Sequence, residues 1–253
     1  MFTGLKRSTA DFREKIWHSP AFAYRLLRVI YVPLHFCRMM LSSSMHRGQL
    51  LARLKYRKHY HQLPNFTKDN RYPSLFHICK EYFKGKQVKI LSFGCSTGEE
   101  VYSLHDYLPE ATVVGVDISE YNLRECRKKE QKENLSFLHC LSETYLQSRD
   151  YDAVFCMAVL QHSDNQKAKM ATAYTFAQFE EQLLALDAKL KPGGLFFIAN
   201  SDFSFLQTRL KNTYFPLDRP GSRVVHDRPL FNSKNERVAE VQNLFRVFLK
   251  KGI

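Results

Sequence analysis

"ILSFGCSTGEEVYSL", residues 90–104, begins as an apolar, strand-like run and ends as the first turns of a helix. Two glycines and small hydroxyl-bearing residues fill the bend between them. Gly94 permits a sharp turn because it has no β-carbon, and Gly98 lets the following helix pack closely on the strand. The backbone of such a bend can approach a ligand closely. The stretch therefore predicts a strand–turn–helix unit whose loop binds a ligand.

The chain around this stretch alternates between apolar, β-branched runs and charged runs of helical spacing. The pattern predicts strands over residues 87–93, 111–117, 134–140, 152–158, 195–201 and 244–251. It predicts helices over residues 74–83, 98–108, 119–131, 169–190 and 203–210. Ser119 is the expected N-cap of its helix, and the "KPGG" of residues 191–194 is expected to end the long one. This alternation predicts a mostly parallel sheet that helices cover on both faces, with a crevice at the carboxyl ends of the strands.

Asp117 ends the second expected strand, about 20 residues after the glycine bend. An acidic side chain at this separation accepts hydrogen bonds from the two hydroxyls of a ribose. Glu99 and Glu100 follow the bend directly, and two carboxylates there would repel a pyrophosphate but tolerate a cationic amino-acid group. Their simpler interpretation is the preference of acidic side chains for the start of a helix.

Four stretches occur in the order seen in class I S-adenosylmethionine-dependent methyltransferases, and the chain resembles that family over residues 88–203. They are "ILSFGCSTGEEVYSL", "VVGVDIS", "DYDAVFCMAVLQH" and "LKPGGLFFIANSDF". The resemblance implies a Rossmann-like, doubly wound, mostly parallel seven-stranded α/β sheet. It also implies S-adenosylmethionine as the cofactor and methyl transfer as the activity.

The resemblance also implies roles for individual residues. Asp117 would bind the ribose hydroxyls, Ile118 would pack on the adenine, and Met157 and Ala158 would border the transferred methyl group. Ser142 and Glu143 stand where the family often contacts the adenine amine, whereas Ser92 replaces an acidic residue common in the family. The loop that would bind the cofactor comprises Gly94, Cys95, Ser96, Thr97, Gly98 and Glu99.

Within the family, "GCSTGEE-YSL" and "LKPGG-F" are most similar to chemotaxis-receptor glutamate methyltransferases (CheR-type). Those enzymes carry an Arg-Asn pair where this chain has Met157 and Ala158, so the acceptor stays open between a small molecule, RNA and a protein carboxyl group. A domain that binds cofactor or a partner without transferring a methyl group is a further alternative.

Methyl transfer depends more on alignment of the reacting groups than on a dedicated base. His162 is the candidate base if the acceptor must lose a proton, and its alternative role is to close a loop.

The N-terminal part of the chain is strongly basic. Of the formal net charge of +13, residues 1–65 hold twelve lysines and arginines against two acidic residues. We therefore expect a basic helical extension over residues 1–70 and the methyltransferase domain over residues 71–253. Such a charge would attract RNA, an anionic membrane surface or an acidic protein, or it would act as a solvated helical cap. Arginines interrupt the apolar residues 21–41 and Pro33 would break or kink a helix there, so an amphipathic helix is expected and a membrane span is not.

The six cysteines include no C-x-x-C pair, which favours a reduced protein without a zinc site or other metal. We expect a cytoplasmic protein, either free or held at the periphery of a membrane.

Overall fold

The computed structural model describes residues 22–56, 67–129, 132–217, 229–239 and 244–252. The chain divides into two compact units, residues 1–51 and 52–253. The predicted boundary near residue 70 falls inside the second unit and stays a prediction.

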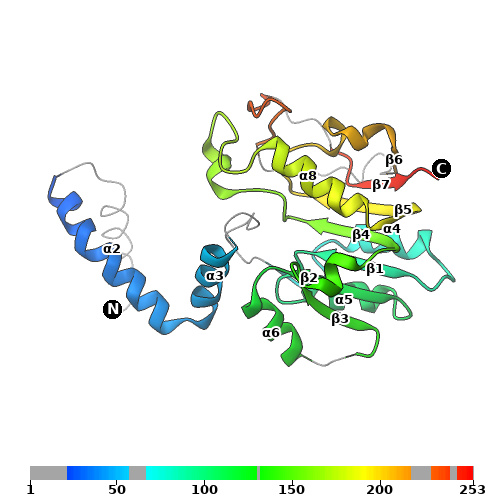
Figure 1. Cartoon of the computed structure of the whole chain (residues 1–253), viewed down its shortest axis with the longest axis horizontal. Coiled ribbons are helices and arrows are strands. Elements are labelled where there is room, and N and C mark those ends of the chain that lie inside the picture. Colours follow the sequence, from blue (N-terminus) through cyan, green and yellow to red (C-terminus); the bar gives the residue numbers. More distant parts are fainter. Residues whose placement is uncertain (1–21, 57–66, 130–131, 218–228, 240–243, 253) are drawn as a thin grey trace, which may run out of the picture. The chain divides into compact units, whose positions relative to one another are not determined.

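The second unit is built on a seven-stranded sheet with the strand order β3-β2-β1-β4-β5-β7-β6 (Figure 1). Strands β1 to β5 run parallel, and β7 runs antiparallel to both of its neighbours, β5 and β6. The fold is therefore the predicted Rossmann-like, doubly wound, mostly parallel sheet. The strands are β1 (Lys89–Phe93), β2 (Thr112–Asp117), β3 (Leu135–His139), β4 (Tyr151–Met157), β5 (Leu190–Ala199), β6 (Tyr214–Pro216) and β7 (Val247–Lys250).

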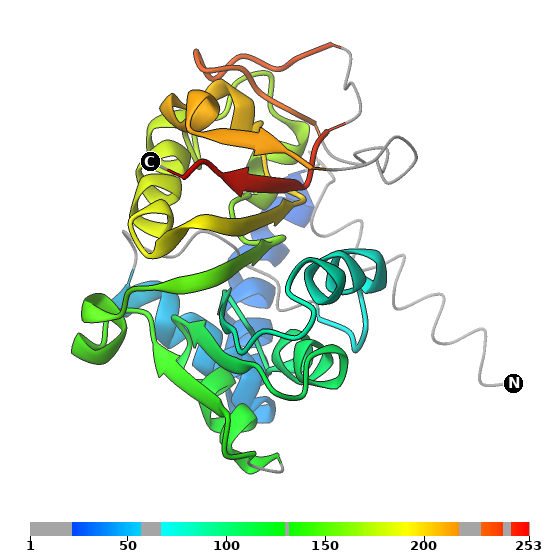
Figure 2. The same cartoon turned by 90° about the vertical axis from the view of Figure 1, so that its right-hand side faces the viewer.

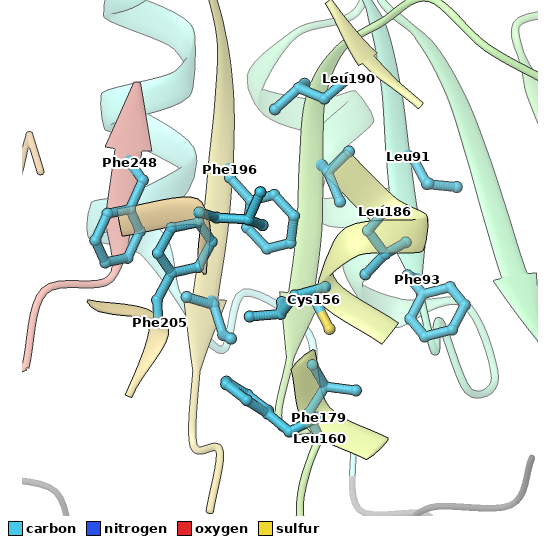
Figure 3. Close-up of a cluster of buried hydrophobic side chains, with 14 of the residues drawn as sticks. Leu91, Phe93, Cys156, Leu160, Phe179, Leu186, Leu190, Phe196, Phe205 and Phe248 are labelled. Carbon is cyan, nitrogen blue, oxygen red and sulfur yellow. The ribbon is translucent and has the colours of Figure 1, made fainter. Parts of the chain in front are cut away.

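Helices cover both faces of this sheet. On one face, α4 (Pro73–Tyr82), α5 (Glu99–Tyr107) and α6 (Glu120–Lys128) bury apolar side chains against the strands. On the other face lie α7 (Glu143–Gln147), α8 (Phe176–Asp187) and the 3₁₀ helices η2 (Phe205–Gln207) and η3 (Arg209–Asn212). Figure 3 shows Phe179 and Leu186 of α8 among the side chains of the sheet. The central strands β1, β2 and β4 are thus buried on two sides, which explains their nearly continuous apolar sequences.

Two predicted boundaries around the long helix are wrong. Helix α8 begins at Phe176 instead of residue 169, because Thr175 and Gln178 form a capping box there. Asn165 also holds the segment before the helix in a non-helical path, since its amide binds the carbonyl oxygen of Tyr174 and the backbone N–H of Ala173. The "KPGG" of residues 191–194 lies inside β5, where these residues stand opposite Asp152 alone and form a bulge.

The expected helix over residues 203–210 is also wrong, because the segment forms η2 and η3 separated by Thr208. The expected N-cap at Ser119 is confirmed, since its side chain accepts a hydrogen bond from the backbone N–H of Asn122. Strand β6 follows η3 and was not predicted, because three residues are too short for a periodic signal.

The described part of the basic segment is helical, as expected. Helix α2 spans Phe22–Ser42 and runs through Pro33 without the predicted break, and α3 spans Ser44–Lys55. Among the residues that the structure describes, no helix has the length and apolarity needed to cross a membrane. Residues 1–21 and 57–66, which hold several of the counted charges, lie outside the described part.

Candidate functional site

The loops after β1 and β2 meet at the carboxyl edge of the sheet. The backbone N–H groups of Gly94 and Cys95 donate to the carbonyl oxygen of Val116, at 2.7 and 3.0 Å. The next N–H, of Ser96, donates to Oδ2 of Asp117 at 2.9 Å. The glycine bend and the acidic residue that the sequence placed about 20 residues apart are therefore in direct contact. They lie where the strand order reverses between β1 and β4, which is where open α/β sheets bind ligands.

Asp117 organises this corner through several hydrogen bonds. Its Oδ1 accepts from the backbone N–H of Ser119 at 2.8 Å and from the side-chain amide of Asn122 at 3.0 Å, while Oδ2 accepts from Ser96. Burial raises the pKa of the Asp117 carboxyl even though these donors favour the ionised form. A carboxylate has about four lone-pair positions. Three are in use here, so Asp117 keeps capacity on Oδ2 for one further donor.

The bend itself has the features of a ligand cradle. Gly94 has a φ of +77°, and a β-carbon there would collide with a methyl group of Val159. Gly98 has a φ of +93° and leads directly into α5. The hydroxyl of Ser96 is buried and makes no hydrogen bond within the described part of the chain. Because buried hydroxyls are rarely left without a partner, this atom fits a polar group of a bound molecule.

Two acidic residues at the start of α5 face different surroundings. Glu99 accepts hydrogen bonds from the Thr97 hydroxyl and pairs with Lys129 at 2.9 Å. Burial raises the pKa of Glu99, but the bonds from Thr97 and Lys129 outweigh it, so that the pKa lies below its ordinary value. Thr97 and Glu99 are thus engaged with each other and with the end of α6.

Glu100 is turned toward β1, where its Oε1 accepts from the Ser92 hydroxyl at 2.7 Å. Burial raises the pKa of the Glu100 carboxyl to about 7, against the opposing effects of Ser92 and of the Arg71 charge. Ser92 is the position where the family often carries an acidic residue, so Glu100 brings a carboxylate to that place from the next helix. The missing acid at position 92 is visible in the sequence, whereas the approach of Glu100 to the same place depends on the fold.

The residues after β3 form the far side of the corner. His139 accepts from the backbone N–H of Leu141 through Nδ1, so its Nε2 carries the proton and donates to the carbonyl oxygen of Ile118 at 3.0 Å. Ser142 caps α7 and donates to the carbonyl oxygen of His139. Glu143 is exposed and accepts from Gln147 on the next turn of α7. The predicted adenine contacts of Ile118, Ser142 and Glu143 stay predictions.

The remaining candidates lie after β4 and inside the core. Met157 and Cys95 are buried in the apolar layer beneath α4 to α6. Ala158 has a φ of +59° and donates its backbone N–H to the carbonyl oxygen of Ala199, which ties the ends of β4 and β5 together. His162 accepts from the backbone N–H of Asp164 through Nδ1 and caps a 3₁₀ helix, the loop-closing role that was its alternative. Its role as a base stays a prediction.

Among the described residues, no group of three or more His, Cys, Asp and Glu side chains could hold a metal ion. All six cysteines are free thiols.

Comparisons with known proteins agree with the geometry. Residues 90–178 match a family model described as a methyltransferase domain. A curated relative, malonyl-[acyl-carrier protein] O-methyltransferase 2 of Ilyobacter polytropus, is 33% identical over 129 residues, which are 51% of this chain and 42% of that protein. The chain thus spans less than half the length of the curated relative it matches.

Two of the solved structures to which this chain is similar are described as methyltransferases. The plantazolicin methyltransferase BpumL in complex with SAH is 19% identical, with a TM-score of 0.38, and the match covers 64% of this chain and 55% of that one. An S-adenosylmethionine-dependent methyltransferase from Mesorhizobium loti is 19% identical, with a TM-score of 0.37 and coverages of 50% and 51%. The fold assignment itself rests on the strand order described above. Residues 90–178, which the methyltransferase-domain model matches, are the part of the chain that holds the converging loops.

Proposed function

We propose that this protein is an S-adenosylmethionine-dependent methyltransferase. The observation that carries the proposal is the contact between Ser96 and Asp117, which joins the loops after β1 and β2 at the point where the strand order reverses. The match of residues 90–178 to a methyltransferase domain supports it independently.

The residues at the corner fit the parts of this cofactor. Asp117 would accept from a ribose hydroxyl through the capacity left on Oδ2, and the buried Ser96 hydroxyl offers a further polar contact. Glu100 would balance the cationic amino-acid end, since the loss of water around its buried carboxyl favours pairing of the ionised form with a positive group. When bound, the cofactor supplies a methyl group on a sulfonium that is already a good leaving group. The chain's task is then to bind, orient and keep water away from the reacting atoms.

Calorimetric titration with S-adenosylmethionine and its demethylated product tests the proposal directly. The wild-type protein should bind both, and Asp117→Asn should bind them at least about tenfold more weakly because one acceptor oxygen is lost. Asp106→Asn, on the exposed side of α5, is the matched control and should bind as the wild type does. If the wild type binds neither compound while it is folded by circular dichroism, the proposal is wrong.

For the acceptor we propose O-methylation first, because the curated relative is named as an O-methyltransferase. A narrower version, methylation of a protein carboxyl group as in the chemotaxis-receptor enzymes, is favoured by the "GCSTGEE" loop but not by Met157, which is buried where those enzymes carry an arginine. Incubation with radiolabelled cofactor and a fractionated cell extract separates these acceptors from RNA. Base-labile label on protein would support the narrower version, and label confined to RNA would contradict O-methylation of a carboxyl group. Cofactor binding without any labelled product would favour a non-catalytic domain.

For the basic N-terminal segment we propose an anionic membrane surface as the partner. Ile30, Leu34, Cys37 and Leu41 recur at helical spacing along α2 and are exposed, which gives this basic helix an apolar stripe. The full chain should sediment with vesicles that contain phosphatidylserine and not with neutral vesicles. Leu34→Glu should weaken this binding, whereas Val29→Glu, off the stripe, should matter less. Salt-sensitive binding of RNA together with no binding to either vesicle would contradict the proposal and point to RNA.

A further inference from the structure

A cavity of about 330 Å³ opens at the carboxyl end of β5. Three segments far apart in the sequence line it: residues 71–74 at the start of α4, residues 198–201 and 203–205 at the end of β5, and residues 244–246 before β7. Figure 2 shows β5 and β7 side by side, with β7 in red. The volume is at the lower end of the range for small-molecule sites. Nothing in the proposed cofactor corner uses this cavity.

The lining of the cavity is cationic. It contains Arg71 and Arg246, and none of the described residues that line it is acidic. The guanidinium of Arg71 lies 5.2 Å from the centre of the Tyr72 ring. The charges of both arginines act on the Tyr72 hydroxyl and lower its pKa, but burial has the larger effect and the pKa is raised. Tyr72 therefore keeps its proton at neutral pH and presents a neutral hydroxyl between two cations.

Asn200 orients the Tyr72 hydroxyl through a hydrogen bond. The side-chain amide of Asn200 donates to the Tyr72 oxygen at 3.1 Å, so the hydroxyl proton can be given to a ligand. Asn200 directly follows β5 and has a φ of +52°, a left-handed conformation that asparagine adopts more readily than most residues. The N-terminus of α4, with Pro73 in its first turn, adds the positive end of a helix dipole. Two guanidinium groups, a hydroxyl donor and a helix N-terminus thus converge on one space.

The cavity lies close to the reacting end of the proposed cofactor corner. Arg71 lines the cavity, and its charge acts on Glu100 of the cofactor corner, so the cavity and the corner are electrostatically coupled. The backbone bond from Ala158 to Ala199 connects the cavity wall to the end of β4, where the family resemblance expects the transferred methyl group. A molecule in the cavity would therefore lie next to the cofactor and not on a remote surface.

We propose that this cavity binds the acceptor of the methyl group and that the acceptor is a small molecule with a carboxylate, held by Arg71, Arg246 and Tyr72. Guanidinium groups bind carboxylates through paired, charge-assisted hydrogen bonds, and the phenylalanines of the lining would contact an apolar body. Phe203, Phe205 and Phe245 favour an aromatic or alkyl body of limited size. The inference rests on the proposed function, because it assigns the substrate class for the same site.

The binding test uses 3-phenylpropanoate and its neutral amide as probes, each titrated into the full chain with and without the demethylated cofactor. The wild type should bind the carboxylate at least about tenfold more tightly than the amide, and Arg246→Gln should abolish this preference. Arg124→Gln, an exposed arginine on α6, is the matched control and should keep it. Equal binding of the two probes by the wild type, or an unchanged preference in Arg246→Gln, would overturn the proposal. Tighter binding of phenyl phosphate than of the carboxylate would overturn it as well.

A second arm separates the acceptor from the cofactor. Arg246→Gln should bind the demethylated cofactor as the wild type does, and its thermal midpoint should stay close to that of Arg124→Gln if it is folded. A loss of cofactor binding in a folded Arg246→Gln protein would mean that the cavity receives the cofactor's own carboxylate, which contradicts the proposal. If instead the wild type binds the carboxylate probe but never the cofactor, the proposed function fails while the anion site stands.

Discussion

Glu100→Gln should change how the stability of the protein depends on pH. The carboxyl has an ordinary pKa of 4.5, and burial raises it to about 7 in the folded chain. Between these pH values the folded protein holds a proton that the unfolded chain has lost. The free energy of unfolding of the wild type should therefore fall as the pH rises from 4.5 to about 7 and level off above that.

The size of the effect follows from the shift. A rise in the pKa from 4.5 to about 7 corresponds to about 3–4 kcal/mol, because each pKa unit is worth about 1.4 kcal/mol. Glutamine has nearly the same shape and no charge, so the variant lacks this loss and gains stability relative to the wild type as the pH rises. Asp117, whose pKa is also raised, is present in both proteins and cancels in the difference. Urea unfolding of both proteins at several pH values between about 4.5 and 8 measures that difference.

Two further results decide the interpretation. Glu181→Gln, on the exposed side of α8, is the matched control and should follow the wild type at every pH. The wild type should also bind S-adenosylmethionine more tightly as the pH rises through about 7, because a cationic ligand favours the ionised carboxyl, and Glu100→Gln should lose this dependence. A stability difference between Glu100→Gln and wild type that is constant over the pH range would refute the assigned pKa.

The fold offers two more tests. Gly94→Ala should lose about 2–4 kcal/mol of unfolding free energy, because the cost of a left-handed φ adds to that of a collision with Val159. Gly193→Ala has nearly the same φ but lies in open space, so it should lose only about 1–2 kcal/mol. Denaturant titration compares the two variants, and equal losses would contradict the role of Val159. Phe197→Ala should lose about 3–5 kcal/mol, because this fully buried ring stacks on Phe155 with centroids 4.0 Å apart, and the same titration detects it. A loss below about 1 kcal/mol would mean that the core relaxes into the space.

The sequence predicts the parts of this molecule that are decided within one strand–loop–helix unit. The bend at residues 94–98, Asp117 at the end of β2 and the cap at Ser119 each depend on neighbours a few residues away, and all lie where the pattern places them. The "KPGG" segment failed because Pro and Gly usually end an element, while here a bulge opposite Asp152 absorbs all four residues and lets β5 continue. Local signals cannot show such a bulge, since it depends on the register between two strands.

The cavity beside β5 could not be predicted for a different reason. Tyr72 and Asn200 are 128 residues apart, and only the folded sheet with its helices brings them within hydrogen-bonding distance. Arg71 and Arg246 carry no motif, and in the sequence they are two of 38 basic residues. They indicate a binding site for an anion only because they line the same cavity, in which none of the described lining residues is acidic.

Ser92 and Glu100 show how a carboxylate can reach the end of β1 from the neighbouring helix. A carboxylate on β1 would be fixed by the strand, whereas Glu100 reaches the same place from the first turn of α5 and is held there by the Ser92 hydroxyl at 2.7 Å. If this bond positions the carboxylate, Ser92→Ala should weaken binding of S-adenosylmethionine and leave its pH dependence in place, because the carboxyl still titrates. Ser92→Asp should also bind S-adenosylmethionine more weakly than the wild type. Two buried carboxyls side by side would repel each other, and one of them would stay protonated. Wild-type affinity in Ser92→Ala would show that the helix alone positions Glu100.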